Sequence, residues 1–170
     1  MSTATEKELT LRDRSLGQLP ITALMEVVHE AFFHEFREEL VEAGYAEIRP
    51  THGCVFRFVH DEGLRLTDLA ALAAMTKQSV GEIVDNLVEL GYVERIPDPD
   101  DKRAKLIRLT AKGKTAQGVG LSIFAKLEAR WAEHFGAERM DGMRELLEDI
   151  ANVKAPQAVP ELAQATLAHH

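Results

Sequence analysis

Apolar residues recur at three- and four-residue spacing near both ends of this chain, as they do along helices that bury one face. The first run covers about residues 20–43 and stops before Gly44, a residue that suits a helix end. A second run covers 111–135, Gly136 interrupts it, and a third run continues to about residue 153. The pattern therefore predicts one long helix near the N-terminus and two near the C-terminus.

Shorter helices are predicted between these long ones. Thr51 is the expected N-cap of one short helix, and Thr67 is the expected N-cap of the next. After a tight turn that begins at Ala74, Thr76 is expected to cap a longer helix, which Gly91 ends. Two helices of these lengths joined by a tight turn form a helix-turn-helix.

The second helix of this pair has one apolar and one polar face. Its apolar stripe consists of Val80, Ile83, Val84, Leu87 and Val88. Side chains on the polar face, near the N-terminal end, are the ones that meet base edges when such a helix enters a major groove. On this helix the residues that we expect to contact DNA are Thr76, Lys77, Gln78, Ser79, Glu82 and Asn86. For the acids Glu82 and Asp85 two interpretations stay open, because an acid on this face either accepts a hydrogen bond from cytosine or simply faces solvent.

A β-hairpin is predicted immediately after this helix. Residues 91–96 and 104–109 alternate loosely between apolar and polar side chains, as half-buried strands do. Pro99, which stands between aspartates, favours a tight turn between the two strands. The tip carries the cations Lys102, Arg103 and Lys105, so we expect it to contact an anionic partner. Thr110 then caps the next helix.

The distribution of charge narrows the class of that partner. The chain of 170 residues carries a net charge of −8, which argues by itself against nucleic acid. Residues 95–114, however, contain seven Lys or Arg and three Asp, a local net charge of +4. An acidic protein with one basic stripe is compatible with focused DNA binding.

The order helix, turn, helix, hairpin is that of a winged helix, and two motifs carry a closer resemblance. Asp98-Pro-x-Asp101-x-Arg103, followed by Leu109-Thr110-x-x-Gly113, resembles the wing signature of the MarR family of transcriptional regulators. The preceding segment, with Met75-Thr76-Lys77-Gln78-Ser79 and Leu90-Gly91-Tyr92-Val93-Glu94-Arg95, is similar to the part of that family that reads DNA. The resemblance covers about residues 66–113.

The resemblance implies a fold class and a domain organisation. The fold is expected to be mainly α with a small β-hairpin wing: a winged helix-turn-helix lobe plus long N- and C-terminal dimerisation helices. The expected ranges are 1–18 for a loose N-terminal arm, 19–154 for a single domain, about 48–113 for the lobe, about 20–43 and 111–153 for the dimerisation helices, and 155–170 for a C-terminal tail.

The resemblance also implies a function. It implies a homodimer that binds a palindromic operator in double-stranded DNA, usually as a repressor, and that leaves DNA when a small aromatic or phenolic compound binds. In the family's pattern the wing arginine, here Arg103, reaches into the minor groove, and the aspartate two residues earlier, here Asp101, holds it. A narrow minor groove concentrates negative potential and attracts arginine. The remaining expected DNA contacts are Arg95, Lys102 and Lys105, and the expected ligand pocket lies beside His29, Phe32, Phe33 and Arg57.

Two alternatives to a DNA-binding regulator were considered. A winged helix dimer without operator binding, serving as a protein-interaction or small-molecule-binding module, stays open because of the acidic total charge and the acids Glu82 and Asp85. An enzyme is not expected, because the sequence has no Gly-x-Ser-x-Gly elbow, no phosphate-cradling loop and no His-Glu-x-x-His pair. No cofactor is expected either.

The remaining candidate chemistry belongs to Cys54 and the histidines. Cys54 is either a redox sensor or an inert core residue, and the second is favoured because only Arg57 lies near it in sequence to lower its pKa. The residues His29, His34, His52 and His60 are not spaced as a compact metal motif, so no metal site is expected, and the terminal His169 and His170 are left out of this assignment. A single cysteine, no apolar leader and no membrane-length apolar run predict a cytoplasmic protein.

Overall fold

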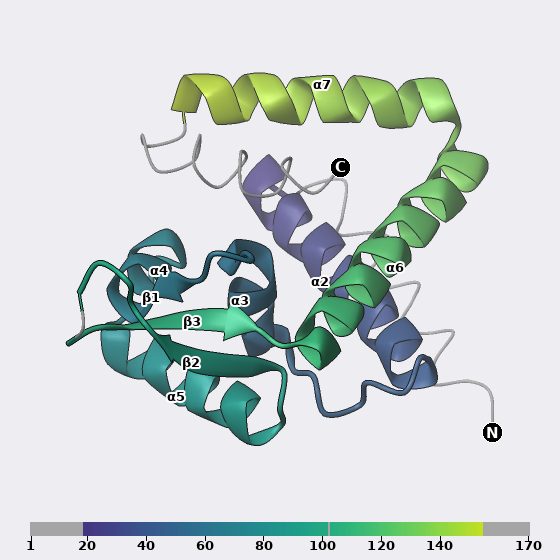
Figure 1. Ribbon diagram of the computed structural model, residues 1–170. Coiled ribbons are helices and arrows are strands. Elements are labelled where there is room, and N and C mark those ends of the chain that lie inside the picture. The colour runs from purple at the N-terminus through teal and green to yellow at the C-terminus, as the bar shows by residue number, and fades with distance from the viewer. Residues whose placement is uncertain (1–18, 102, 155–170) are drawn as a thin grey trace.

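The computed structural model describes residues 19–101 and 103–154, which form two groups of elements (Figure 1). The predicted N-terminal arm, Lys102 and the predicted C-terminal tail lie outside the described residues. Within the described part, the predicted fold class is confirmed: the chain is mainly helical and has one small antiparallel sheet. None of the described helices is both long enough and apolar enough to cross a membrane.

Three long helices form the first group. They are α2 (Ile21–Glu42), α6 (Ala111–Phe135) and α7 (Ala137–Lys154). Gly44, with φ of +89°, lies just after α2, and Gly136, with φ of +96°, separates α6 from α7, as predicted. Glycine adopts this backbone conformation without the steric penalty that a side chain brings. In Figure 1 α2 crosses α6, while α7 runs along the edge of the molecule away from the sheet.

The helices α2 and α6 share a small core of their own. Leu40 of α2 is buried together with Ile123 and Leu127 of α6. Farther along, Phe124 of α6 stacks on Phe36 of α2, with ring centroids 4.4 Å apart. Aromatic pairs of this kind add to the stabilisation that apolar burial provides. The crossing of the two long helices is therefore held by side chains of both.

Shorter elements form the second group, which we call the lobe. Its elements are η1 (Pro50–His52), α3 (Gly53–Phe58), β1 (Leu64–Arg65), α4 (Leu66–Leu72), α5 (Lys77–Glu89), β2 (Val93–Pro97) and β3 (Lys105–Leu109). The strands are antiparallel in the order β1-β3-β2, with Val93 opposite Leu109 and Leu64 opposite Ile107. The predicted stripe of α5 supplies Val80, Val84 and Leu87 to the buried core of the lobe.

Two of the four predicted threonine caps are confirmed. The Thr76 hydroxyl accepts a hydrogen bond from the Ser79 backbone N–H at 3.1 Å and begins α5. Thr110 begins α6 in the same way, with Gly113 as the donor at 3.1 Å. Each bond satisfies one of the backbone N–H groups that a helix start leaves without a partner. Ala74, in the turn before Thr76, adopts a positive φ of 52°.

The other two predicted caps are wrong. Thr51 lies inside η1, which begins at Pro50; the Arg49 backbone N–H at its start is bound by the ring Nδ1 of His52 at 3.1 Å. Thr67 lies inside α4, because Arg65 is held in the extended strand β1 and the helix starts directly after it. Strand β1 itself was not predicted, since two residues are too few to show a period-two alternation.

The hairpin joins α6 through a close backbone approach. The Thr110 backbone N–H donates to the Tyr92 carbonyl oxygen at 3.0 Å, and its hydroxyl donates to the Gly91 carbonyl oxygen at 2.7 Å. A side-chain Cβ at Gly113 would overlap the Tyr92 carbonyl oxygen. The motif Leu109-Thr110-x-x-Gly113 therefore places the first turn of α6 directly against the start of β2.

Candidate nucleic-acid interface

The start of α5 presents its polar side chains to solvent. Thr76, Lys77, Gln78 and Glu82 are exposed, and Ser79 is half-buried. The hydroxyls of Thr76 and Ser79 hydrogen-bond each other at 2.8 Å, and the Gln78 amide nitrogen donates to the Glu82 carboxylate at 3.3 Å. The structure therefore brings five of the predicted DNA contacts together on one exposed surface of this helix.

The loop end of the hairpin is fastened to the strand β1 by an ion pair, because Asp98 directly follows β2 and opens the loop. Asp98 is only 4% exposed, and its Oδ2 accepts hydrogen bonds from Arg65 Nε at 2.7 Å and Nη2 at 2.6 Å. Its Oδ1 accepts from the Asp100 backbone N–H at 2.9 Å. That backbone bond, followed by the Arg65 guanidinium, lowers the pKa of Asp98, while Asp98 raises the pKa of Arg65. The pair ties the start of the hairpin loop to the third strand of the sheet.

Arg65 is a residue that sequence analysis missed. Its partner Asp98 opens the wing motif, but the motif alone suggests only turn chemistry for that aspartate. Arg65 lies 33 residues earlier, in the strand β1 that was not predicted. The signal that sequence analysis lacked was the pairing of β1 with β3, which brings the two side chains together.

The tip of the hairpin differs from the prediction in one respect. Asp101 was expected to hold the Arg103 guanidinium, but its Oδ1 accepts a hydrogen bond from the Arg103 backbone N–H at 3.0 Å. Among the described residues no ion pair joins these two side chains. A short aspartate in a turn reaches the backbone two residues on more readily than the end of an arginine. Asp101 thus shapes the turn, and the Arg103 side chain extends from it into solvent.

The basic stripe of residues 95–114 separates into paired and unpaired cations. Its paired members are Arg95 with Asp85, Arg108 with Glu94, Lys112 with Glu47 and Lys114 with Asp61. Arg103 and Lys105 are exposed and form no ion pair within the described part of the chain, and the same is true of Lys77. Only unpaired cations can neutralise phosphate without first breaking a contact. Arg95 is thus a weaker candidate for DNA contact than predicted.

Asn86 does not share the exposed surface at the start of α5. It is half-buried, and its side-chain oxygen lies 3.1 Å from Nε2 of His52, which is 1% exposed. Because Nδ1 of the same ring accepts from Arg49, Nε2 is the donor to Asn86. Burial lowers the pKa of His52, and the neutral ring fits both bonds. Asn86 therefore fastens α5 to η1.

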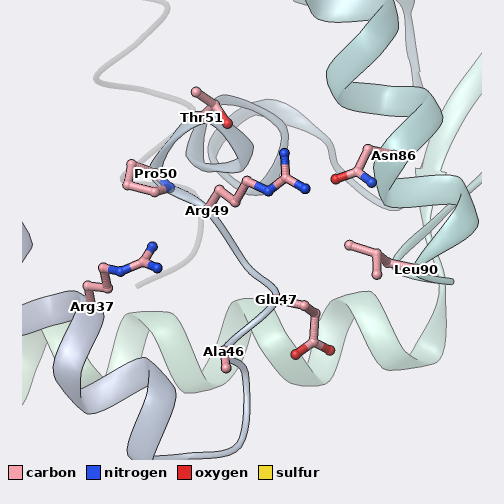
Figure 2. Close-up of a pocket in the computed structure, with 8 residues that line it drawn as sticks. All are labelled: Arg37, Ala46, Glu47, Arg49, Pro50, Thr51, Asn86 and Leu90. Carbon is pink, nitrogen blue, oxygen red and sulfur yellow. The ribbon is translucent and has the colours of Figure 1, made fainter.

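The four residues predicted to lie beside a ligand pocket are on two helices, α2 and α3. His29, Phe32 and Phe33 lie on α2, where His29 packs against Phe33 with ring centroids 4.5 Å apart. Arg57 lies on α3 above the ring of Phe58. A cleft of about 560 Å³ opens elsewhere, between the end of α2 and α5, and none of the four lines it (Figure 2).

Cys54 and the histidines are the other candidate sensors. Cys54 is half-buried and its thiol donates to the Thr51 carbonyl oxygen at 3.3 Å. Burial raises the pKa of Cys54, which disfavours the reactive thiolate. No group of three or more His, Cys, Asp or Glu is placed to hold a metal ion within residues 19–101 and 103–154.

Comparison with known proteins agrees with this geometry. The model of the MarR family matches residues 47–104. The HTH-type transcriptional regulator BilQ of Clostridioides difficile (strain CD3) is 29% identical over 108 residues, which cover 61% of this chain and 70% of BilQ. The structure of a MarR family transcriptional regulator from Rhodococcus sp. RHA1 is 26% identical, with a TM-score of 0.62 over 77% of this chain and 91% of that one.

Two further solved relatives carry the name CouR and hold different ligands. CouR from Rhodococcus jostii RHA1, bound to p-coumaroyl-CoA, is 25% identical, with a TM-score of 0.62 over 81% of this chain and 95% of CouR. The transcriptional repressor CouR bound to a 23-mer DNA duplex is 22% identical and has a TM-score of 0.65 over the same shares of the two chains. At 22% identity the second likeness supports the fold alone.

The fold and the exposed helix start beside a basic hairpin define a winged helix-turn-helix DNA-binding protein. Its wing motif and DNA-reading segment, the family match and the relatives all point to the same group. Over residues 47–104 the chain matches the MarR family of transcriptional regulators, a family of DNA-binding proteins and not of enzymes.

Proposed function

We propose that this protein is a ligand-responsive repressor that binds an inverted-repeat operator as a homodimer in the cytoplasm. DNA binding is supported above all by one observation: the cations Lys77, Arg103 and Lys105 are exposed and form no ion pair within the described residues. In Figure 1 the start of α5 and the tip of the hairpin lie at the same end of the lobe, away from α6 and α7. A helix in the major groove and a wing in the adjacent minor groove require this arrangement.

The residues proposed to contact DNA follow from that surface. On α5 they are Thr76, Lys77, Gln78, Ser79 and Glu82, and on the wing they are Arg103, Lys105 and, outside the described residues, Lys102. Asp101 acts through the turn that presents Arg103. The acid Asp85 opposes this function less than its charge suggests, because Arg95 pairs with it. The alternative without operator binding therefore loses one of the observations that favoured it, while the acidic total charge and Glu82 remain.

An apolar row on α7 supports the homodimer. Met143, Leu146, Leu147 and Ile150 are between 41% and 60% exposed, and every residue from 141 to 152 is exposed. Residues at this spacing lie on one face of a helix, and such a face is normally buried against a partner. A second copy of the chain would bury it, and two-fold symmetry of the dimer would then match two inverted half-sites in DNA.

The regulatory part of the proposal is supported by relatives. One CouR, described as a transcriptional repressor, was solved on a DNA duplex, and CouR from Rhodococcus jostii RHA1 was solved with p-coumaroyl-CoA. We propose the same kind of response here, with an effector that carries an aromatic or phenolic group. The domain organisation expected from the sequence, a lobe at about 48–113 between dimerisation helices at about 20–43 and 111–153, is part of this proposal.

The experiment is a gel shift with the DNA that flanks the coding region, at several salt concentrations. We expect specific binding that weakens steeply with salt, because phosphate contacts release counterions. Arg103→Ala should weaken binding by roughly tenfold or more, since one arginine contact to DNA contributes about 1–3 kcal/mol. Arg144→Ala, which removes an exposed arginine of α7 that pairs with Glu128, serves as the matched control and should bind as the parent does. Equal binding by the parent and the Arg103 variant would contradict the wing assignment.

A further inference from the structure

The proposed DNA-binding surface of α5 includes an acid, Glu82. This residue is exposed and lies one helical turn after Gln78 and Ser79, which are among the proposed DNA contacts. Residues three and four apart are neighbours on the surface of a helix. A base edge that either Gln78 or Ser79 reaches therefore also lies close to the Glu82 carboxylate.

No cation within the described residues offsets the charge of Glu82. Asp85, the next acid on α5, is paired with Arg95, whereas Glu82 forms no ion pair with any residue of 19–101 and 103–154. An uncompensated carboxylate repels the phosphates of DNA. Glu82 thus lowers the affinity for DNA in general, and a hydrogen-bond donor on a base edge is the group that can offset this cost.

Gln78 holds the carboxylate of Glu82 in place before any DNA binds. The side-chain amide nitrogen of Gln78 donates to Oε1 of Glu82 at 3.3 Å. Oε2 accepts no hydrogen bond from the described part of the chain, and an ionised carboxylate has lone pairs for about four donors. The carboxylate is therefore free to accept a further hydrogen bond. Because its orientation is already restricted, ordering it on DNA costs less entropy.

The four bases differ in what they offer to such an acceptor in the major groove. Cytosine presents a donor, the N4 amino group, whereas guanine presents two acceptors, O6 and N7. Adenine presents one donor and one acceptor, and thymine presents an acceptor and a methyl group. An ionised carboxylate has no proton to donate, so it bonds to cytosine and is repelled by guanine.

We propose that Glu82 is a specificity-determining residue that selects cytosine, and rejects guanine, at one position of each operator half-site. Gln78 is the positioning residue that orients the carboxylate. This inference rests on the proposed function, because it names the base that the proposed DNA-binding surface reads.

Glu82 should therefore differ from the cations of this surface in its effect on binding. Loss of a cation that contacts phosphate weakens binding to all sequences about equally. Loss of the Glu82 carboxylate should strengthen binding to unrelated DNA, because the repulsion disappears, and should weaken the preference for cytosine. An acid that merely faces solvent would leave that preference unchanged.

The experiment selects operators from a library of random DNA duplexes with the full-length protein. We expect an inverted repeat in which each half-site has cytosine at one position. The same selection with Glu82→Gln identifies this position as the one at which cytosine is no longer enriched.

Binding to two duplexes then measures the preference, with fluorescence anisotropy as the readout. Replacing the C·G pair by G·C at this position of both half-sites should weaken binding by the parent protein roughly tenfold or more. In Glu82→Gln this ratio should fall to about threefold or less, because an amide donates to guanine as well as accepting from cytosine.

A matched control and a second variant separate specificity from folding. Glu89→Gln removes an exposed acid at the far end of α5 and should keep the ratio of the parent. Gln78→Ala should lower the ratio, and combining it with Glu82→Gln should lower the ratio no further than Glu82→Gln alone. Equal melting temperatures would show that the variants fold.

The role of Glu82 is refuted if Glu82→Gln selects the same sequences as the parent with an unchanged ratio; the operator-binding function would then still stand. It is also refuted if Glu89→Gln lowers the ratio as far as Glu82→Gln does, because the effect would then come from net charge and not from a contact. If the parent enriches no sequence and binds all duplexes alike, the proposed function itself fails, and the role of Glu82 fails with it.

Discussion

Gly113 shows how strongly a single residue constrains this molecule. It lies in the first turn of α6, where the Tyr92 carbonyl oxygen occupies the space that a side chain would need. Its φ is not positive, so the requirement comes from the neighbouring strand and not from local backbone conformation. The sequence motif marks Gly113, but only the packing explains why a larger residue is excluded there.

Alanine substitutions at Gly113 and at a second glycine of α6 should therefore distinguish the effect of packing on stability from the effect of helix propensity. Gly113→Ala should lower the free energy of unfolding by about 1–3 kcal/mol, because the added methyl group forces α6 away from β2. Gly118→Ala, on the same helix and with open space around its Cα, should instead raise it by roughly 0.5–1 kcal/mol. Urea unfolding of the two variants measures both changes. A stabilised Gly113 variant would contradict the close approach.

At the scale of elements, the wing depends on strand β1, which lies outside the hairpin in the sequence. The hairpin strands β2 and β3 were predicted from alternation and turn residues, and both are confirmed within two residues. The short strand β1 completes the sheet and supplies Arg65, which holds the buried Asp98 at the loop end of the hairpin. The orientation of the wing is thus a property of three strands.

This arrangement predicts that the wing can be loosened without touching its tip. Asp98→Asn removes the charge that Arg65 binds, so the hairpin should become more mobile and DNA affinity should fall, although Arg103 and Lys105 are unchanged. Arg65→Gln should have a similar effect, and the double variant should be little worse than either single one, as expected for two partners of one interaction. Gel shifts measure the affinity, and hydrogen exchange of the β3 amides measures the mobility. Additive losses would show that the two residues act independently.

At the scale of the whole molecule, two separate hydrophobic cores stabilise two different parts of the structure. One core holds the lobe together, and the smaller one joins α2 to α6. The helix α7 adds nothing to either within residues 141–152, since all its side chains there are exposed. A helix whose apolar row stays this exposed within its own chain is expected to gain part of its stability from a partner.

The proposed homodimer can be tested by substitutions in α7. Leu146→Asp should weaken the dimer by at least tenfold, because burying a leucine contributes about 1.5–3 kcal/mol and a buried unpaired charge opposes association. Glu145→Ala alters the opposite face of the same helix and should leave the dimer intact. Light scattering after size-exclusion chromatography gives the mass of each variant. A monomeric parent protein, or a Leu146 variant as dimeric as the parent, would contradict the proposal.

The sequence by itself determined the features that depend on neighbouring residues. The helices end at Gly44, Gly91 and Gly136, and Thr76 and Thr110 cap α5 and α6, because caps and glycine turns are formed within a few residues of chain. The family resemblance of the wing motif could likewise be recognised from its residue types and their spacing.

Only the tertiary structure decided the roles that depend on partners far along the chain. Four of the seven cations in the basic stripe of residues 95–114 form ion pairs with acids. Asn86, which was expected to contact DNA, hydrogen-bonds His52 instead. Arg65 binds Asp98, which lies 33 residues later in the chain. The physical reason is that an ion pair forms between groups a few ångströms apart in space, a distance that position in the sequence does not specify.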